Sequence, residues 1–350
     1  MREVGAITHM RGRLYMVSVY SAAHFLVDFA CAFLMFKSIS GTRDWYTLVL
    51  IYNFCAFAMQ MPLGILADRL GRNFLFAAIG CVLVGAAYAL WSVPIAAVIA
   101  VGIGNGMFHV GGGIDILNIS GEKSGALGIF VSPGAFGIYF GTILGKQGGL
   151  SAAPVLVALL IAAALIFAVR RAHGGEYPQN AAFSLDGGAS PRILIAAVCL
   201  FIVVCLRSFV GLTLNFPWKS AGYWGVAAVC AVVLGKTAGG FVSDRLGPVK
   251  TACVSLGAAA ALFLIPEIPA AGLLSLLLFN MTMPVTLWAM AKAFPGAKGF
   301  SFGLLTFGLF LGFLPVHLGV ASASFAPWFF AAAAVLSLAL LWLGLRRARL

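Results

Sequence analysis

The sequence predicts an all-α membrane protein with twelve transmembrane helices in two pseudo-symmetric bundles of six. Of its 350 residues, 62% are hydrophobic and only 9% are charged, and the mean hydropathy is +1.05. Apolar runs of about 20 residues, enough to cross a hydrocarbon core of about 30 Å, recur along the whole chain. A G-x-x-x-D-R-L-G turn begins at Gly64 and again at Gly240, half a chain length later, which indicates a duplicated architecture.

Twelve apolar runs can be assigned in order. The first six are expected at 15–37, 45–66, 73–92, 94–119, 125–147 and 151–169. The last six are expected at 192–215, 222–243, 249–266, 268–290, 299–320 and 325–345. Residues 170–191, which contain Pro178 and the run Asp186-Gly187-Gly188, resemble a polar linker. The chain therefore divides into an N-terminal bundle over 1–169, a cytoplasmic linker over 170–191 and a C-terminal bundle over 192–350.

The net charge of +12 is explained by orientation in a membrane. With the N-terminus inside, most of the 22 Lys and Arg residues fall on the cytoplasmic side of the predicted spans. This bias is the positive-inside pattern, so we expect both termini in the cytoplasm and an integral protein of the cell or bacterial inner membrane. Nucleic acid is not an expected partner. All seven cysteines lie inside predicted spans without a C-x-x-C pair, so neither disulfides nor a metal site is predicted.

The turn between the second and third spans carries the most specific pattern in the chain. It reads G-x-L-A-D-R-x-G-R over residues 64–72, and the copy between the eighth and ninth spans has Pro248 where the first has Arg72. With twelve spans in two sets of six, this pattern resembles the major facilitator superfamily over essentially the whole chain. The resemblance implies a transporter whose spans 1, 4, 7 and 10 line a central cavity. For the turn alone, a solvated loop is the alternative.

In that family the carboxylate of this turn is thought to hold the cytoplasmic face shut by meeting the positive end of a helix from the other half. The resemblance implies that Asp68 and Arg69 face the start of the eleventh span, near Lys298 and Gly299. A gate role is less secure for the copy that carries Pro248. The implied gating residues are Asp68, Arg69, Arg72, Asp244 and Arg245.

A narrower likeness lies in spans 4 and 5. Residues 102–109 read G-x-G-x-x-x-F-H and resemble the fosmidomycin-resistance branch of drug exporters, although Val110 stands where a proline is expected. The fifth span loosely resembles the G-P-containing motif of superfamily antiporters, with Ser132 in place of the glycine before Pro133. Pro133 removes a backbone hydrogen bond and bends the helix, and the surrounding glycines allow close helix approach. Glycine-rich packing alone would explain this segment equally well.

Ionisable side chains inside the spans are candidate site residues, because each costs several kcal/mol at bilayer depth unless it is paired or hydrated. In span 1, His24 and Asp28 are four residues apart and share one helical face, so the pair can share a proton. In span 4, Asn105 and His109 share a face by the same spacing. The alternatives are a structural pair in span 1 and a satisfied packing histidine in span 4.

Span 7 carries Arg207 and span 1 carries Asp28, both roughly 20 Å deep in the predicted bundle. Either the two form a salt bridge that substrate or proton breaks, or Arg207 binds an anionic group through two hydrogen bonds. In span 10, Asn280 and Trp288 would offer an amide and an aromatic wall to a ligand, and ordinary packing is equally consistent with them.

Two further charges lie within the spans. Lys236, in span 8, would either extend toward the cytoplasm beside Asp244 or have a binding role, and both explain it equally well. Asp115, near the cytoplasmic end of span 4, would pair with Arg69 or Arg72.

These residues favour a secondary active transporter that moves a small organic solute by alternating access. The resemblance of spans 4 and 5 to drug exporters and antiporters implies proton-coupled export by antiport, and Arg207 equally suits proton-coupled uptake of an anionic metabolite. Protons are the expected coupling ion, carried by Asp28 with His24 or His109.

Other protein classes are less consistent with the sequence. No G-x-x-x-x-G-K-[ST] loop is present, so ATP is not expected as the direct energy source. A membrane-embedded enzyme or sensor would need paired catalytic groups or a catalytic segment outside the membrane, and neither is recognised. We expect no enzyme activity, no cofactor, and a monomer whose partners are its substrate, protons and the lipid bilayer.

Overall fold

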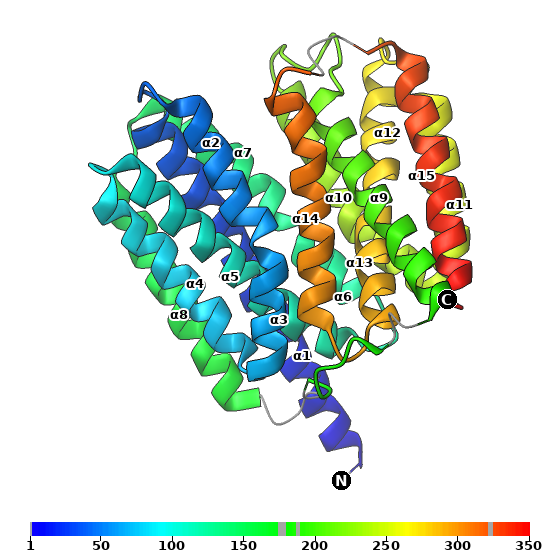
Figure 1. Cartoon of the computed structure of the whole chain (residues 1–350), viewed down its shortest axis with the longest axis horizontal. Coiled ribbons are helices and arrows are strands. Elements are labelled where there is room, and N and C mark those ends of the chain that lie inside the picture. Colours follow the sequence, from blue (N-terminus) through cyan, green and yellow to red (C-terminus); the bar gives the residue numbers. More distant parts are fainter. Residues whose placement is uncertain (1, 174–179, 187–189, 321–324) are drawn as a thin grey trace.

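The computed structural model describes residues 2–173, 180–186, 190–320 and 325–350, with side chains described from residue 12 on. Every regular element in these ranges is helical. Figure 1 shows the helices of the N-terminal half beside those of the C-terminal half, and the described residues 180–186 between the halves lie at the end of the molecule where both termini lie. We call this end the linker face.

The N-terminal half contains eight α-helices and three short helical turns of other types. They are α1 (Arg2–Leu34), η1 (Met35–Ile39), α2 (Trp45–Asn53), η2 (Phe54–Ala58), α3 (Gln60–Leu70), α4 (Asn73–Ala87), η3 (Tyr88–Leu90), α5 (Pro94–Ser120), α6 (Gly125–Val131), α7 (Pro133–Gln147) and α8 (Ala152–His173).

The C-terminal half is built from seven α-helices. They are α9 (Pro191–Thr213), α10 (Trp224–Leu246), α11 (Pro248–Leu262), α12 (Pro269–Asn280), α13 (Thr282–Ala293), α14 (Lys298–His317) and α15 (Pro327–Arg347).

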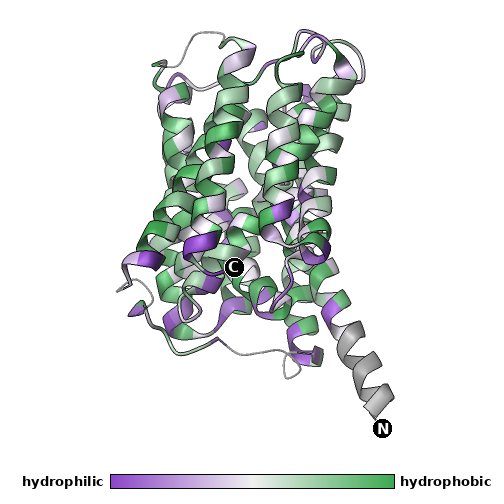
Figure 2. Cartoon of the chain, turned by 90° about the vertical axis from the view of Figure 1, so that its right-hand side faces the viewer, coloured by the Kyte–Doolittle hydropathy of each residue, from purple (hydrophilic) through white to green (hydrophobic). Residues whose placement is uncertain are grey.

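Within the described ranges, eleven helical segments are long and apolar enough to cross a membrane. They follow the predicted spans in order, but the ninth, predicted at 249–266, is different. Its helix α11 ends at Leu262 and spans only 15 residues, because the chain turns before Pro266 and Pro269. Figure 2 shows apolar residues along the helices and hydrophilic residues gathered mainly at the two ends.

Two of the spans are interrupted at proline-containing segments. α6 ends at Val131 and α7 begins at Pro133, which has no N–H to donate to the carbonyl of Ile129. α12 and α13 are separated at Met281, three residues before Pro284. Both interruptions lie inside single membrane-spanning segments, Gly125–Gln147 and Pro269–Ala293.

Glycines on α7 bring its backbone against α1. A Cβ atom added at Gly137 or Gly141 would overlap the carbonyl oxygen of Phe25 or Phe29, respectively. Such close approach is typical of small residues at helix interfaces in membranes. It places the same face of α1 that carries His24 and Asp28 directly against the start of α7.

The two halves meet along two matching pairs of helices, α3 with α14 and α6 with α10. Gly64 on α3 abuts the backbone of Gly299, and Gly240 on α10 abuts the backbone of Ser124. At the end opposite the linker face, the ring of Tyr46 stacks on His317 and its hydroxyl donates to the His317 carbonyl.

Candidate functional site

A cluster of two imidazoles and one carboxylate is buried in the N-terminal half. His24 and Asp28 come from α1, and His109 comes from α5. His24 Nε2 lies 3.2 Å from Asp28 Oδ2 and 2.9 Å from His109 Nε2, and His109 Nε2 lies 3.7 Å from Asp28 Oδ1. Asn105 Nδ2 donates to Asp28 Oδ1 at 3.0 Å. The sequence placed these four side chains on two helical faces, and the structure brings them into one group.

Backbone carbonyls determine where the hydrogens of the two imidazoles lie. His24 Nδ1 is 2.7 Å from the carbonyl oxygen of Phe130, and His109 Nδ1 is 2.9 Å from that of Asn105. Because a carbonyl oxygen only accepts, both Nδ1 atoms carry hydrogen, and the two Nε2 atoms of neutral imidazoles would face each other as acceptors. The Nε2–Nε2 hydrogen bond therefore requires one additional proton, which the adjacent carboxylate of Asp28 stabilises.

The spacing within this cluster fits a shared proton better than a metal ion. The ligand atoms of His24, Asp28 and His109 lie within 4.8 Å of one another, which is close enough for a cation. Two nitrogens bound tetrahedrally to zinc at about 2.0–2.1 Å would be about 3.4 Å apart. The observed separation of 2.9 Å is that of a hydrogen bond.

A single arginine, Arg207 on α9, is buried in the C-terminal half, with only 8% of its surface exposed. Its Nη2 donates to the hydroxyls of Thr282 and Thr286 on α13, each at 3.1 Å. No carboxylate of the described residues forms an ion pair with it. The salt bridge with Asp28 that the sequence left open is therefore not formed, because Asp28 is held by the imidazoles of its own half.

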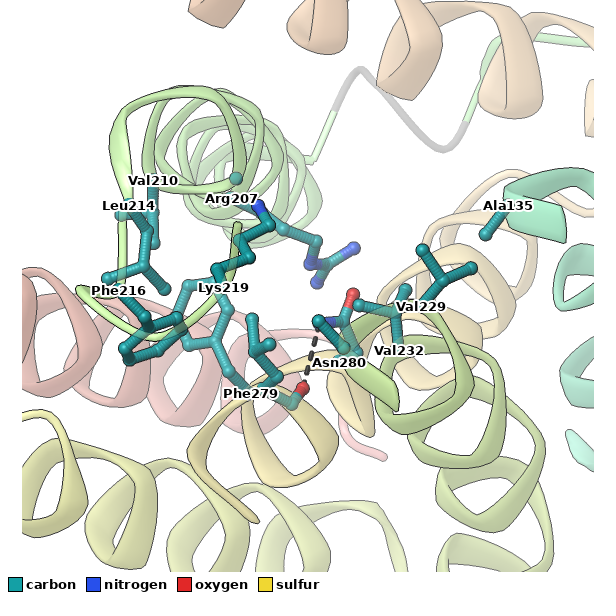
Figure 3. A pocket seen from close by; sticks show the side chains of 13 residues that line it. Ala135, Arg207, Val210, Leu214, Phe216, Lys219, Val229, Val232, Phe279 and Asn280 are labelled. Carbon is teal, nitrogen blue, oxygen red and sulfur yellow. Dashed lines mark hydrogen bonds between the residues drawn. The ribbon is translucent and has the colours of Figure 1, made fainter. Parts of the chain in front are cut away.

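The guanidinium of Arg207 borders a cavity of about 240 Å³ between α9, α10 and α12 (Figure 3). Asn280 lines the same cavity and donates its amide hydrogen to the Leu276 carbonyl at 2.8 Å. Most of the other lining side chains are apolar. They include Val210, Leu214, Phe216, Val229, Val232 and Phe279.

At the linker face, each copy of the repeated turn caps a helix of the other half. Asp68 accepts hydrogen bonds from the N–H groups of Gly299, at 2.8 Å, and Phe300, at 2.9 Å, in the first turn of α14. Asp244 accepts from the N–H groups of Ser124, at 2.6 Å, and Gly125, at 3.0 Å, at the start of α6. The second contact is complete although its turn carries Pro248. Both carboxylates meet the positive end of a helix dipole.

Solved structures of transporters share the fold of this protein over nearly the whole chain. The E. coli fucose:proton symporter FucP superposes with a TM-score of 0.67 at 14% identity, covering 97% of this chain and 98% of FucP. The FucP structure in the outward conformation, described as a major facilitator superfamily transporter, gives 0.65 at 15% identity, covering 96% and 99%. This chain has the major facilitator fold.

A third structure with the major facilitator fold is that of the human organic anion transporter MFSD10 (TETRAN). It gives a TM-score of 0.67 at 17% identity and covers 94% of this chain and 99% of its own. Neither a protein-family model nor a curated protein sequence matches the chain. The likeness of residues 102–109 to the fosmidomycin-resistance branch therefore stays a prediction.

Other sequence-predicted site residues lie away from the cavity. Trp288 donates from its indole N–H to the Gly121 carbonyl at 3.2 Å, near the Asp244 contact, and does not line the cavity. Arg69 lies over the ring of Phe183, with 5.0 Å between its guanidinium carbon and the ring centroid. Arg72 and Arg245 are exposed.

The structure rules out the contact of Lys236 with Asp244, which was one of two alternatives, and the expected partners of Asp115 were wrong. Lys236 does not extend toward Asp244, because its ammonium donates to the Val131 carbonyl at 3.3 Å, at the end of α6. Asp115 accepts from the Tyr20 hydroxyl at 2.6 Å and from the Asn73 amide at 2.9 Å. These partners, and not Arg69 or Arg72, satisfy its carboxylate.

A serine pattern that the sequence analysis did not recognise occurs at the start of α14. Residues 299–303 match G-x-S-x-G, which in hydrolases presents a nucleophile at a strand-to-helix turn. Here Ser301 lies within a helix, is fully buried and donates to the Ala297 carbonyl at 2.8 Å. The two glycines instead let α14 pack against α3, so the match indicates helix packing.

Thr282 stood out in the sequence only as a neighbour of Asn280 in span 10, and its pairing with Thr286 around Arg207 was missed. Thr282 and Thr286 are four residues apart and share one face of α13, a spacing that is visible in the sequence. A T-x-x-x-T pair in a span facing a buried arginine was the available signal.

Proposed function

We propose that the protein is a secondary active transporter that moves a small organic solute across the membrane by alternating access, coupled to protons. The observation that carries the proposal is the 2.9 Å hydrogen bond between His24 Nε2 and His109 Nε2, beside the buried carboxylate of Asp28. This bond needs one proton more than two neutral imidazoles supply, and we infer that the cluster takes up and releases this proton during transport.

The rest of the molecule supplies the other parts of such a cycle. The caps that Asp68 and Asp244 form on helices of the opposite half close the linker face, which we assign to the cytoplasm. With α11 counted as the ninth span, the chain crosses the membrane twelve times in two bundles and acts as a monomer of the inner membrane. The proton symport described for FucP supports proton coupling within this fold.

Export by antiport is our leading direction, and uptake with protons is the alternative. Release of the proton into an inward-facing cavity would, in antiport, precede solute binding at the same stage of the cycle. In symport, proton and solute would leave together. An imposed pH gradient separates the two, because it drives solute against proton flow in antiport and with proton flow in symport.

The test is solute flux in proteoliposomes with and without a pH gradient, in the wild type, Asp28→Asn and Asp115→Asn. Asp115 is the matched control, since it is also a buried carboxylate of the N-terminal half but lies outside the cluster. We expect the gradient to drive flux in the wild type and in Asp115→Asn only. Gradient-driven flux that survives Asp28→Asn, or wild-type flux that ignores the gradient, would overturn proton coupling through this cluster.

A further inference from the structure

The positive charge of Arg207 has no negative partner in the described part of the chain. Two threonine hydroxyls accept from one of its nitrogens, and a guanidinium has further N–H donors to offer. An ionised group that is buried without a counterion is strongly disfavoured inside a membrane protein. One negative charge beside Arg207 would therefore be needed to balance its guanidinium.

Neighbouring charges add to this deficit. Asp28, the nearest candidate acid by depth, is engaged by His24, His109 and Asn105 in the other half. Lys236 on α10 is close enough for its positive charge to repel that of Arg207. The interior between the halves thus holds two cations on the C-terminal side, and the one carboxylate beside them belongs to the proton cluster.

The cavity next to Arg207 shows what kind of molecule could supply the charge. No aspartate or glutamate lines it, and the exposed Lys219 adds a second positive charge to its wall. Figure 3 shows the guanidinium directed into the space between α9, α10 and α12, with Asn280 beside it. Val210, Leu214 and Phe279 present apolar surface in the same cavity.

We propose that this cavity binds a small organic anion, with a carboxylate or sulfonate on Arg207 and an apolar body against Val210, Leu214 and Phe279. The inference rests on the proposed transport function and names its substrate class. The guanidinium matches the two oxygens of such a head group, because it can donate two parallel hydrogen bonds. The volume of about 240 Å³ is below the range of about 300–1,000 Å³ for drug-sized ligands, which indicates a small solute.

Alternative ligands fit the cavity less well. A cation would meet Arg207 and Lys219 and would leave the guanidinium uncompensated. A neutral solute would fill the apolar part but would leave the same charge buried and unpaired. An inorganic anion would satisfy Arg207 but would leave the apolar wall without a contact, so binding would gain nothing from burying it.

The test is equilibrium binding to the purified protein in detergent at a single pH, by isothermal titration calorimetry. The probes are benzenesulfonate, the neutral aromatic amide benzamide, the cation benzyltrimethylammonium, and sulfate. We expect the wild type to bind benzenesulfonate at least about tenfold more tightly than any of the other three, since a charge-assisted pair is worth more than about 1.4 kcal/mol.

Variants of Arg207 test whether the anion binds at its guanidinium. Arg207→Gln should lower benzenesulfonate affinity at least about tenfold and leave benzamide binding unchanged, while Arg207→Lys should keep part of the anion preference. Lys146→Gln, an exposed cation of the N-terminal half, is the control and should change nothing. Size-exclusion profiles and thermal unfolding show whether each variant is folded, and Arg207→Lys decides the matter if Arg207→Gln is not.

Several results would overturn the inference. These are equal wild-type affinity for benzenesulfonate and benzamide, tighter binding of the cation, sulfate binding as tight as benzenesulfonate, no binding of any probe at millimolar concentration, and Arg207 variants with unchanged anion affinity. None of these measurements uses a gradient. Failure here would therefore leave proton-coupled transport standing, and loss of proton coupling in the flux experiment would leave the anion site standing.

Discussion

The two halves of the molecule bury charge in opposite ways. In the N-terminal half, Asp28 lies 3.2 Å from the His24 imidazole, 3.7 Å from the His109 imidazole and 3.0 Å from the Asn105 amide. In the C-terminal half, Arg207 is held from one side by two hydroxyls and is open to a cavity on the other. The same duplicated helices thus carry one self-contained polar cluster and one incomplete one. Under the proposed function, protons would be handled in the first half and solute in the second.

A pair of glycine substitutions separates these roles most sharply. A Cβ added at Gly134 would overlap Asp28 Oδ2 and His24 Nε2, whereas one added at Gly211, which lines the cavity, meets nothing within 4 Å. We expect Gly134→Ala to abolish gradient-driven flux and to destabilise the fold by about 1–3 kcal/mol, as overpacking does. Gly211→Ala should keep both the gradient-driven flux and the stability of the wild type. Flux in proteoliposomes and thermal unfolding measure the effects, and a normal Gly134→Ala protein would break the comparison.

The next largest effect should distinguish the two imidazoles of the N-terminal cluster. His24 lies closer to Asp28 than His109 does, and it also connects α1 to the Phe130 carbonyl of α6. We therefore expect His24→Gln to reduce gradient-driven flux about 3- to 10-fold more than His109→Gln, since the net worth of one hydrogen bond is about 0.5–1.5 kcal/mol.

The control for this pair is His317→Gln, which changes a histidine of the C-terminal half that stacks on Tyr46. Its gradient-driven flux should equal that of the wild type. If His109→Gln is the more damaging variant, or if His317→Gln matches either of them, proton handling is not centred on His24 in the N-terminal half.

Variants of Asp68 and Asp244 test whether the two helix caps contribute unequally to closure of the linker face. Asp68 is buried, with 7% of its surface exposed, whereas Asp244 is exposed. Loss of the buried carboxylate in Asp68→Asn should favour opening by about 1–2 kcal/mol, a factor of about 5–30. Asp244→Asn should cost less than about 1 kcal/mol, because water already screens that carboxylate.

Spin-label distances between Arg72 and Lys250 positions, in a cysteine-free background, would report this opening. Arg72 and Lys250 are exposed near the linker face on different halves. Distance distributions that shift equally in the two variants, or more in Asp244→Asn, would show that exposure does not set the strength of the caps.

The smallest effect is expected at Lys219, which is the exposed charge of the C-terminal cavity. Lys219→Gln should change benzenesulfonate affinity less than about threefold and only at low ionic strength, because exposed charges are screened beyond about 8–10 Å in physiological salt. Stopped-flow association rates at low and at high salt measure it. A salt-independent loss as large as that of Arg207→Gln would place the main anion contact at the cavity wall and not at its buried end.

The sequence was sufficient to predict the helical spans, because bilayer thickness and hydropathy together determine their length. It was insufficient for α11, where turn residues before Pro266 shorten the helix. The i,i+4 spacing of His24 and Asp28 also predicted their contact. The separation of Asp28 from Arg207 could not be predicted, because matched depth in a membrane says nothing about the direction in which a helix faces.

The partners of other charged residues depended on the same missing information. Lys236 and Asp115 each had a plausible ionic partner close in depth, yet the structure satisfies them with a carbonyl and with Tyr20 and Asn73. A neutral hydrogen-bond partner has no charge by which the sequence could match it to an ionised side chain. Only the packing of neighbouring helices shows which neutral group lies beside that side chain.

Beside the interruption between α6 and α7, two consecutive carbonyl oxygens accept hydrogen bonds from different halves of the molecule. The oxygen of Phe130 accepts from His24, and the oxygen of Val131 accepts from Lys236 on α10. Because Pro133 prevents a regular helix here, this short stretch can pivot without breaking a continuous ladder of hydrogen bonds. A sideways movement of α10 would displace the Val131 carbonyl. The neighbouring peptide unit carries the Phe130 carbonyl, which orients the His24 imidazole. If the proposed function holds, this stretch would be a mechanical linkage through which movement of the C-terminal half changes the proton cluster of the N-terminal half.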